Sequence, residues 1–110
     1  MHKATKATSI SPAVKTAVWE RDGGRCVCCG SRDAAPNAHF IPRSRMGLGC
    51  EENIVTLCQK CHRIFDQPGT DKEVQTSISM RRFLRSYLKS CYPDWDDKKL
   101  VYHKGENEYA

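Results

Sequence analysis

The chain has 110 residues, seven cysteines and a formal net charge of +5, a balance that allows a polyanionic partner without requiring one. This length favours a single small domain, which buries little apolar surface and often needs a metal or disulfide staple. The odd cysteine count, the Cys-x-x-Cys spacings and the lack of a signal peptide argue against a secreted disulfide scaffold. No apolar run is long enough to cross a membrane, so we expect a soluble cytoplasmic protein with reduced thiols.

The N-terminal part predicts an arm followed by a helix. Residues 1–10 are polar and basic without apolar periodicity, which is typical of a mobile arm. Ser11 and Pro12 predict a helix start, since the serine hydroxyl can cap the helix and proline suits its first position. Residues 22–24 (Asp-Gly-Gly) predict its end, because glycine suits the left-handed cap.

Two Cys-x-x-Cys pairs follow, and their spacing is typical of zinc ligands. Four thiolates form a closed tetrahedral site, which stabilises a fold but does no catalysis. The long insert between the pairs should hold an ordered hairpin. The remaining cysteines, Cys28, Cys50 and Cys91, are interpreted as packing residues or free thiols. The four predicted ligands of structural Zn²⁺ are Cys26, Cys29, Cys58 and Cys61.

Two strands and two helices are expected after the first pair. Residues 37–41 predict a strand that Pro42 ends, and the β-branched run 54–57 predicts a second. The second cysteine pair should lead into a helix that contains Asp66 and ends at residues 67–69. A long helix is predicted from Asp71 to a stop at Pro93. Its apolar stripe, interpreted as core, comprises Val74, Ile78, Phe83, Leu84, Tyr87 and Leu88.

These elements predict an arm at residues 1–10 and one domain at 11–110. The domain has a core at 26–67 and a C-terminal helical extension at 71–102, where Trp95 and Leu100 should pack the tail against the core.

Four polar residues are left over within the core, namely His39, Asn53, His62 and Asp66. Taken singly, each has an ordinary structural interpretation, such as a buried histidine, a turn asparagine or a solvated helix residue. Taken together, they have the donor types of an open metal site that does chemistry. The spacing of four places His62 and Asp66 on one face of a helix.

The motifs AHFIPRS, ENIVTLC and CHRIFD resemble the His-Asn-His signature of the HNH endonucleases, in particular the zinc-knuckle branch common in phage genomes. The flanking segments RDGGRCVCCG and LKSCYPDWDDKKLVYHK are also similar to members of that branch, so the resemblance covers most of the chain. It implies an α+β fold, namely a small zinc-stapled ββα-metal (His-Me finger) core with flanking N- and C-terminal helices.

The resemblance also implies roles for the leftover residues in metal-dependent DNA cleavage. His39 corresponds to the general base that deprotonates water, and Asn53 to the residue that keeps the base in place. His62 corresponds to a ligand of one divalent cation. Asp66 takes the place of a second histidine ligand, and its carboxylate shifts the preference towards Mg²⁺ or Mn²⁺.

One position departs from the family pattern. Many members have a metal-binding Asp or His directly before the base, where this chain has Ala38. Asn37 could substitute through its carbonyl, solvent or phosphate could fill the position, or His39 itself could bind the metal. The sequence therefore leaves open a rival class, a zinc-stapled DNA-binding or protein-docking module with a weakened catalytic site.

The expected partner is DNA. The candidate phosphate contacts are Arg43, Arg45, Lys60 and Arg63, each of which also has an ordinary reading as a solvated charge. A zinc module that binds RNA is less favoured, because no aromatic stacking surface is evident.

The resemblance further implies work beside a phage packaging machine or as a homing or restriction nuclease. If the chain is phage-encoded, it would act in the bacterial host cytoplasm.

Overall fold

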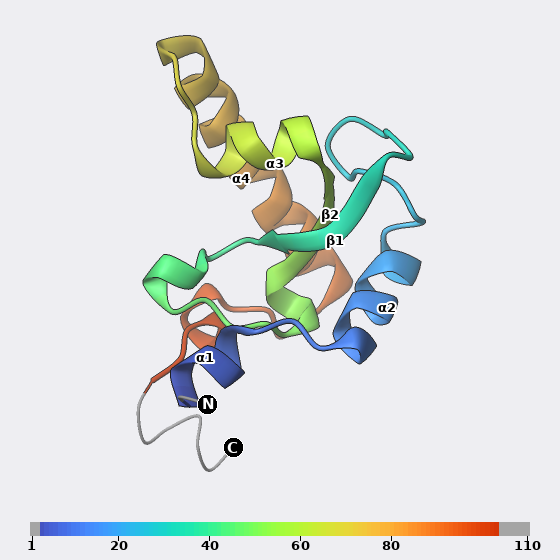
Figure 1. The fold of residues 1–110 in the computed structure, drawn as a ribbon, viewed down its shortest axis with the longest axis vertical. Helices are drawn as coiled ribbons and strands as arrows, with labels where there is room; N and C mark the ends of the chain where they lie inside the picture. Colours follow the sequence, from blue (N-terminus) through green and yellow to red (C-terminus); the bar gives the residue numbers. More distant parts are fainter. Residues whose placement is uncertain (1–2, 104–110) are drawn as a thin grey trace.

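The computed structural model describes residues 3–103 and shows an α+β fold around a small antiparallel sheet (Figure 1). Met1, His2 and residues 104–110, which belong to the predicted arm and domain, lie outside the described residues. The sheet consists of two strands, and longer helices flank it. In chain order the main elements are α1 (Lys3–Thr8), α2 (Pro12–Arg21), β1 (Ala34–His39), β2 (Ile54–Cys58), α3 (Gln59–Asp66) and α4 (Asp71–Cys91).

The register of the sheet places the end of β1 beside the start of β2. Ala34 pairs with Cys58 and His39 with Ile54, and the ladder is irregular between Ala35 and Ala38. The sequence predicts β1 at residues 37–41, whereas the observed strand begins three residues earlier and ends at His39. Pro36 lies within the irregular stretch, where a residue without a backbone N–H is tolerated. The second strand is confirmed and extends one residue further, to Cys58.

The predicted helix signals are confirmed. The Ser11 hydroxyl accepts a hydrogen bond from the backbone N–H of Val14 and caps α2, which has proline at its start. Gly23 and Gly24, both with positive φ, turn the chain after this helix. The predicted starts and stops of the two later helices also hold, and the Thr70 hydroxyl caps α4 by accepting from the N–H of Glu73.

A buried network fastens α2 to the sheet and to α4. The buried Asp22 carboxylate accepts hydrogen bonds from the backbone N–H of Thr56 at 2.8 Å and from the Tyr87 hydroxyl at 2.5 Å. It also pairs with the guanidinium of Arg21, which in turn donates to the carbonyls of Glu51 and Ile54. One ion pair at the end of α2 therefore connects three other parts of the fold.

The predicted core stripe of α4 is only partly correct. Leu84 and Leu88 are buried, but Val74, Ile78 and Phe83 are 39, 49 and 48% exposed. In Figure 1 the N-terminal half of α4 extends beyond the sheet, so its apolar residues have no core to cover. The predicted packing of the C-terminal tail is confirmed, because Trp95 and Leu100 are buried.

The described part of the predicted arm is helical and contacts the domain. Thr8, at the end of α1, is buried, and the Ala7 carbonyl accepts a hydrogen bond from the backbone N–H of Gly49 at 3.0 Å. Only glycine fits at position 49, because an added Cβ would collide with the Ser9 carbonyl. Residues 7–9 therefore lie close against the loop that precedes β2.

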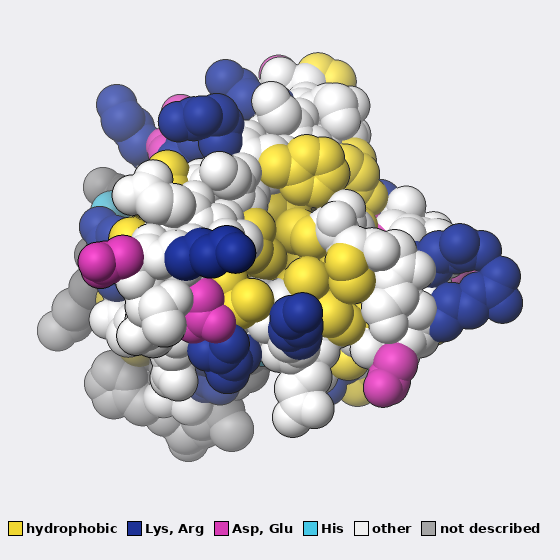
Figure 2. All heavy atoms as spheres, turned by 90° about the horizontal axis from the view of Figure 1, so that it is seen from above, with side chains coloured by type: hydrophobic (Ala, Val, Ile, Leu, Met, Phe, Trp, Pro, Cys, Tyr) yellow, Lys and Arg dark blue, Asp and Glu magenta, His cyan; other side chains and the backbone are white. Residues whose placement is uncertain are grey.

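The surface combines apolar and basic areas. In Figure 2 hydrophobic side chains gather in the middle of one face, and Lys and Arg side chains surround them. None of the helices in residues 3–103 is both long and apolar enough to cross a membrane.

Candidate metal centre and active site

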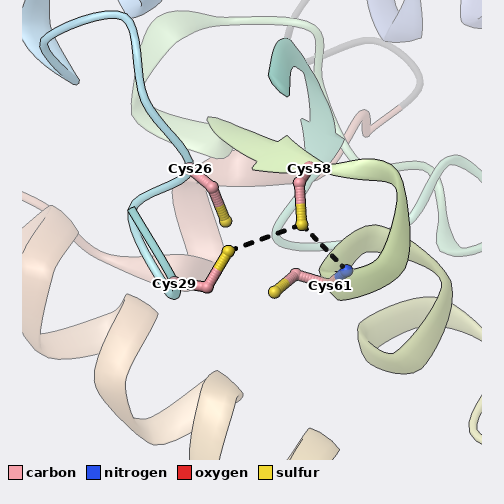
Figure 3. A group of neighbouring side chains, drawn as sticks. All are labelled: Cys26, Cys29, Cys58 and Cys61. Carbon is pink, nitrogen blue, oxygen red and sulfur yellow. Dashed lines mark hydrogen bonds between the residues drawn. The ribbon is translucent and has the colours of Figure 1, made fainter. Parts of the chain in front are cut away.

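The four predicted zinc ligands converge on one point (Figure 3). The Sγ atoms of Cys26, Cys29, Cys58 and Cys61 all lie within 4.8 Å of one another, and those of Cys29 and Cys58 are 3.6 Å apart. A tetrahedral zinc ion with Zn–S bonds of about 2.3 Å would separate its sulfurs by about 3.8 Å. The donor set and its spacing therefore fit a structural zinc ion.

The thiol environments differ within the cluster. Burial raises the pKa of Cys61. The backbone N–H of Ser31 opposes a rise in the pKa of Cys29, but hydrogen bonds with the sulfurs of Cys26 and Cys58 raise it. Burial opposes ionisation of Cys26, but backbone N–H groups of Cys58, Cys29 and Cys28 lower its pKa to about 7, which favours the thiolate that a metal needs. Burial raises the pKa of Cys28 to about 12, so this thiol stays neutral. Among the described residues, Cys28, Cys50 and Cys91 lie outside the metal-holding group, as predicted.

The zinc site also fixes the start of α3. Cys58 is the last residue of β2 and the N-cap of α3, and its Sγ accepts a hydrogen bond from the N–H of Cys61 at 3.4 Å. His62 follows Cys61 directly. The sulfur cluster therefore sets where the polar side chains of α3 begin.

His39 ends β1 and is buried, with an exposed fraction of 8%. Its Nε2 lies 2.9 Å from the carbonyl oxygen of Thr8. A carbonyl only accepts hydrogen bonds, so Nε2 carries the proton and Nδ1 holds the lone pair of the neutral ring. Burial lowers the pKa of His39 below its ordinary value of 6.5, and nearby Arg43 acts in the same direction, although the Thr8 carbonyl opposes the shift.

His62 and Asp66 lie one turn apart on α3. Nε2 of His62 is 2.9 Å from Oδ2 of Asp66, and both side chains are about one-third exposed. The hydrogen bond to Asp66 raises the pKa of His62 above 6.5, against the effect of burial. Two ligands on adjacent corners of an octahedral ion, each about 2.1 Å from the metal, would lie about 3 Å apart. The spacing of this pair therefore suits two neighbouring ligands of one hard cation.

The three residues share one surface cavity of about 570 Å³. The cavity brings together the end of β1, one face of α3 and the segment that links α1 to α2. Its lining residues are Ser9, Ile10, Lys15, Asn37, His39, Pro42, Arg43, His62 and Asp66. Ser9, Ile10 and Lys15 were not expected from the sequence, because they come from a segment without a motif.

Asn53 lies outside the cavity and is fully buried. Its Oδ1 accepts from the N–H of Ile41 at 2.8 Å, and its Nδ2 donates to the carbonyls of Ile41 and Leu48 at 3.1 and 2.8 Å. The backbone carbonyl of Asn53 accepts from the N–H of Phe40 at 2.7 Å. Asn53 therefore fastens the chain just after His39 to the loop and to the start of β2.

Ala38, the position at which the sequence departs from the HNH pattern, belongs to the core. Its exposed fraction is 0%, and it is part of the apolar cluster that contains Phe40. Successive residues of a strand point to opposite faces, so the residues that share the face of His39 are its neighbours two positions away. Asn37 is exposed and lines the cavity, whereas Ala38 does not.

The four predicted phosphate contacts differ in their surroundings. Arg43 is exposed and lines the cavity, and Arg45 and Lys60 are also exposed. Arg63 forms a two-fold ion pair with Glu73, with N–O distances of 2.7 and 3.2 Å. Of the four, Arg43 is therefore the one placed at the cavity.

We expect Cys58→Ser to lose zinc and cooperative unfolding together. Binding of structural zinc contributes about 10–16 kcal/mol to the folding of small zinc domains, and Cys58 also caps α3. The measurement is the zinc content of the purified protein together with its thermal unfolding. Cys91→Ser serves as the matched control and should retain both. A zinc-free Cys58→Ser protein that unfolds like the wild type would contradict the assignment.

We also expect the two cavity histidines to titrate on opposite sides of pH 6.5 when no divalent cation is added. His39 should titrate below this value because it is buried, and His62 above it because Asp66 stabilises the imidazolium. Stability from the His62–Asp66 pair is then fully present below pH 6.5 and is lost as pH rises through the raised pKa. Proton NMR of the imidazole resonances checks the order, and Asp66→Asn should lower the pKa of His62 more than that of His39, because Asp66 is hydrogen-bonded to His62 and acts on His39 only through its charge. The reverse order would contradict the site geometry.

The comparison with known protein families identifies the segment that carries this geometry. Residues 26–64 match the family model described as HNH endonuclease, from the first zinc-ligand cysteine through His39, Asn53 and His62. Comparisons with curated proteins and with solved structures give no match. The two-stranded sheet, the following helix and the cysteine cluster are consistent with the ββα-metal fold of that family. Residues 26–64 are thus similar to an HNH endonuclease domain, and this similarity suggests nuclease activity in the broad sense.

Proposed function

We propose that the protein is a metal-dependent DNA endonuclease that hydrolyses phosphodiester bonds. One observation carries this proposal. A buried, neutral histidine from the sheet and a His–Asp pair from α3 line the same cavity, although they lie more than twenty residues apart in the sequence. These are the groups that water activation and cation binding require.

In this mechanism His39 is the general base. Its Nε2–H donates to the Thr8 carbonyl, which holds the ring and leaves Nδ1 free to take a proton from water. The lowered pKa keeps the ring unprotonated near neutral pH, so the base is available without prior deprotonation. Asn53 acts through the backbone around Phe40 and Ile41 and is a positioning residue rather than a catalytic one.

His62 and Asp66 are the proposed ligands of a divalent cation. Their atoms are spaced as neighbouring ligands, and an imidazole with a carboxylate suits Mg²⁺ or Mn²⁺, whose remaining positions are usually filled by water and phosphate. Such an ion would supply positive charge to the scissile phosphate and to the leaving oxygen. Arg43 and Lys15, both lining the cavity, add positive charge where a phosphate would enter.

A second candidate function is a zinc-stapled module that binds DNA or docks on a protein without cleaving. This second function is favoured because few side chains at the cavity could hold a cation. Within residues 3–103 the cysteine cluster is the only group of three or more His, Cys, Asp or Glu side chains close enough to hold a metal ion. The proposed catalytic cation would thus have two protein ligands, and cleavage assays separate the two functions.

The domain organisation and cellular role belong to the same proposal. We assign residues 26–67 to the catalytic core and α4 with the following tail to a supporting extension. The resemblance to phage-type zinc-knuckle nucleases supports a role in DNA packaging, homing or restriction inside the host cell.

His39→Ala should lower metal-dependent nicking of plasmid DNA by roughly 10²- to 10⁴-fold, which is the usual contribution of a general base. The assay compares Mg²⁺, Mn²⁺ and no added divalent cation. His103→Ala is the control, since this exposed histidine lies outside the cavity. If wild type and His39→Ala are equally inactive with every cation while both bind DNA, the second candidate function replaces the first. Equal activity of the two proteins would contradict the role of His39.

Gly49→Ala should lower the cleavage rate by roughly 10- to 100-fold, although Gly49 touches none of the reacting groups. The added methyl group would collide with the Ser9 carbonyl and displace the segment whose Thr8 carbonyl holds His39. The measurement is kcat in the plasmid assay, with zinc content as a check on folding. Gly69→Ala is the matched control, because a Cβ there makes only ordinary contacts. Unchanged kcat in Gly49→Ala would show that the N-terminal segment does not position the base.

A further inference from the structure

Three arginines of α4 line a second, shallow surface cavity of about 430 Å³ that the proposed mechanism does not use. Arg81, Arg82 and Arg85 share this cavity with Ser77 and Ile78. In the sequence these arginines lie mostly off the apolar stripe of the helix. The structure gathers their side chains around one hollow.

Few carboxylates balance this arginine cavity. Within the described part of the chain, Arg85 is the one of the three with an ion pair, at 2.6 Å from Asp97. The exposed Arg82 has no carboxylate within ion-pair distance among these residues. Burial lowers the pKa of Arg81, and the charges of Arg85 and Arg45 act in the same direction. The cluster thus carries excess positive charge that an anion would offset.

Arg81 ties the arginine cavity to the candidate active site. Its guanidinium carbon lies 5.0 Å from the ring centre of Phe40 and 4.4 Å from that of Phe65, and it donates to the Phe40 carbonyl at 2.8 Å. These two phenylalanines directly adjoin His39 and Asp66 in the chain. Because these contacts hold Arg81 in place, the cavity has a fixed position relative to the catalytic groups.

Basic groups lie at both cavities. Arg43 lines the active-site cavity. Arg45 ends the short 3₁₀ helix Arg43–Arg45, and its charge lowers the pKa of Arg81. Asp66, a proposed cation ligand, also acts on Arg81. Positive charge therefore lies at the active-site cavity, at Arg43, and on α4, at the arginine cavity.

Resting on the proposed function, we propose that the arginine cavity of α4 binds backbone phosphates of the DNA strand that extends from the active site. Arg82 and Arg85 would contact the phosphates, and Arg81 would hold this part of α4 in position. Guanidinium groups suit this task because they donate several hydrogen bonds to phosphate oxygens. Such contacts carry no sequence information, so they would position DNA rather than select it.

The test is the salt dependence of DNA binding in a background that does not cleave. His39→Ala protein is titrated against a short fluorescent duplex across a potassium chloride series. Each phosphate contact contributes about 0.9 to the slope of the logarithm of the binding constant against the logarithm of the salt concentration. Arg82→Gln should therefore lower the magnitude of this slope by about 1. Arg82→Lys should retain most of it. Arg85 is not substituted, because its loss would also leave Asp97 unpaired.

Arg32→Gln is the matched control, since it removes an exposed arginine from the loop before β1. An equal slope change in Arg32→Gln and Arg82→Gln, or no change in either, would overturn the phosphate assignment even if the wild type cleaves DNA. A slope change confined to Arg82→Gln supports it even if the wild type never cleaves, in which case the proposed catalysis alone fails. Absence of any salt-dependent duplex binding would overturn both.

Discussion

The sulfur cluster is the constraint on which the rest of the structure depends. It joins the loop after α2 to the residue that ends β2 and caps α3, so a zinc ion held there would fix the entry and the exit of the sheet. A domain of this size buries a modest apolar core, so a metal staple would add to the stability of a short helix. With the start of α3 fixed at Cys58 and Cys61, His62 and Asp66 follow at set positions along this two-turn helix, Asp66 being its last residue. The structural ion and the proposed catalytic ion thus use different donors on one helix.

The other half of the candidate site is held by backbone groups rather than by metal. His39 is oriented by the Thr8 carbonyl, and Asn53 fixes the chain immediately after it through hydrogen bonds to Ile41. Arg81 joins the halves, because its guanidinium lies across both Phe40 and Phe65. The relative position of His39 and the His62–Asp66 pair is therefore supported by the stacking of Phe40 on Phe65 and also by a residue of α4, outside the matched segment of residues 26–64.

Much of this fold follows from local patterns in the sequence. The paired cysteines predict the cluster because a tetrahedral ion accepts only certain spacings, and Ser11 and Pro12 predict the start of α2 because both act locally. The gathering of His39, His62 and Asp66 in one cavity agrees with the resemblance, while their chemical roles remain proposals.

Long-range contacts were the part that the sequence could not predict. The partner of His39 is a backbone carbonyl, which every residue has, so nothing in the sequence marks Thr8. The apolar period of α4 assigns Val74 and Ile78 to a core that does not extend that far, whereas Arg81 packs on aromatic rings despite its charge. Periodicity describes a helix face but not what lies opposite it.

The alternation of β1 has a consequence for protein engineering. A designer who wished to strengthen the proposed cation site would turn first to position 38, where the resemblance to HNH endonucleases implies a ligand. In this scaffold that side chain is enclosed by the core, and a carboxylate there would be buried without a partner. Asn37 already opens onto the cavity, one residue earlier on the face of His39. Design of a third oxygen ligand should therefore start from the asparagine and leave the alanine in place.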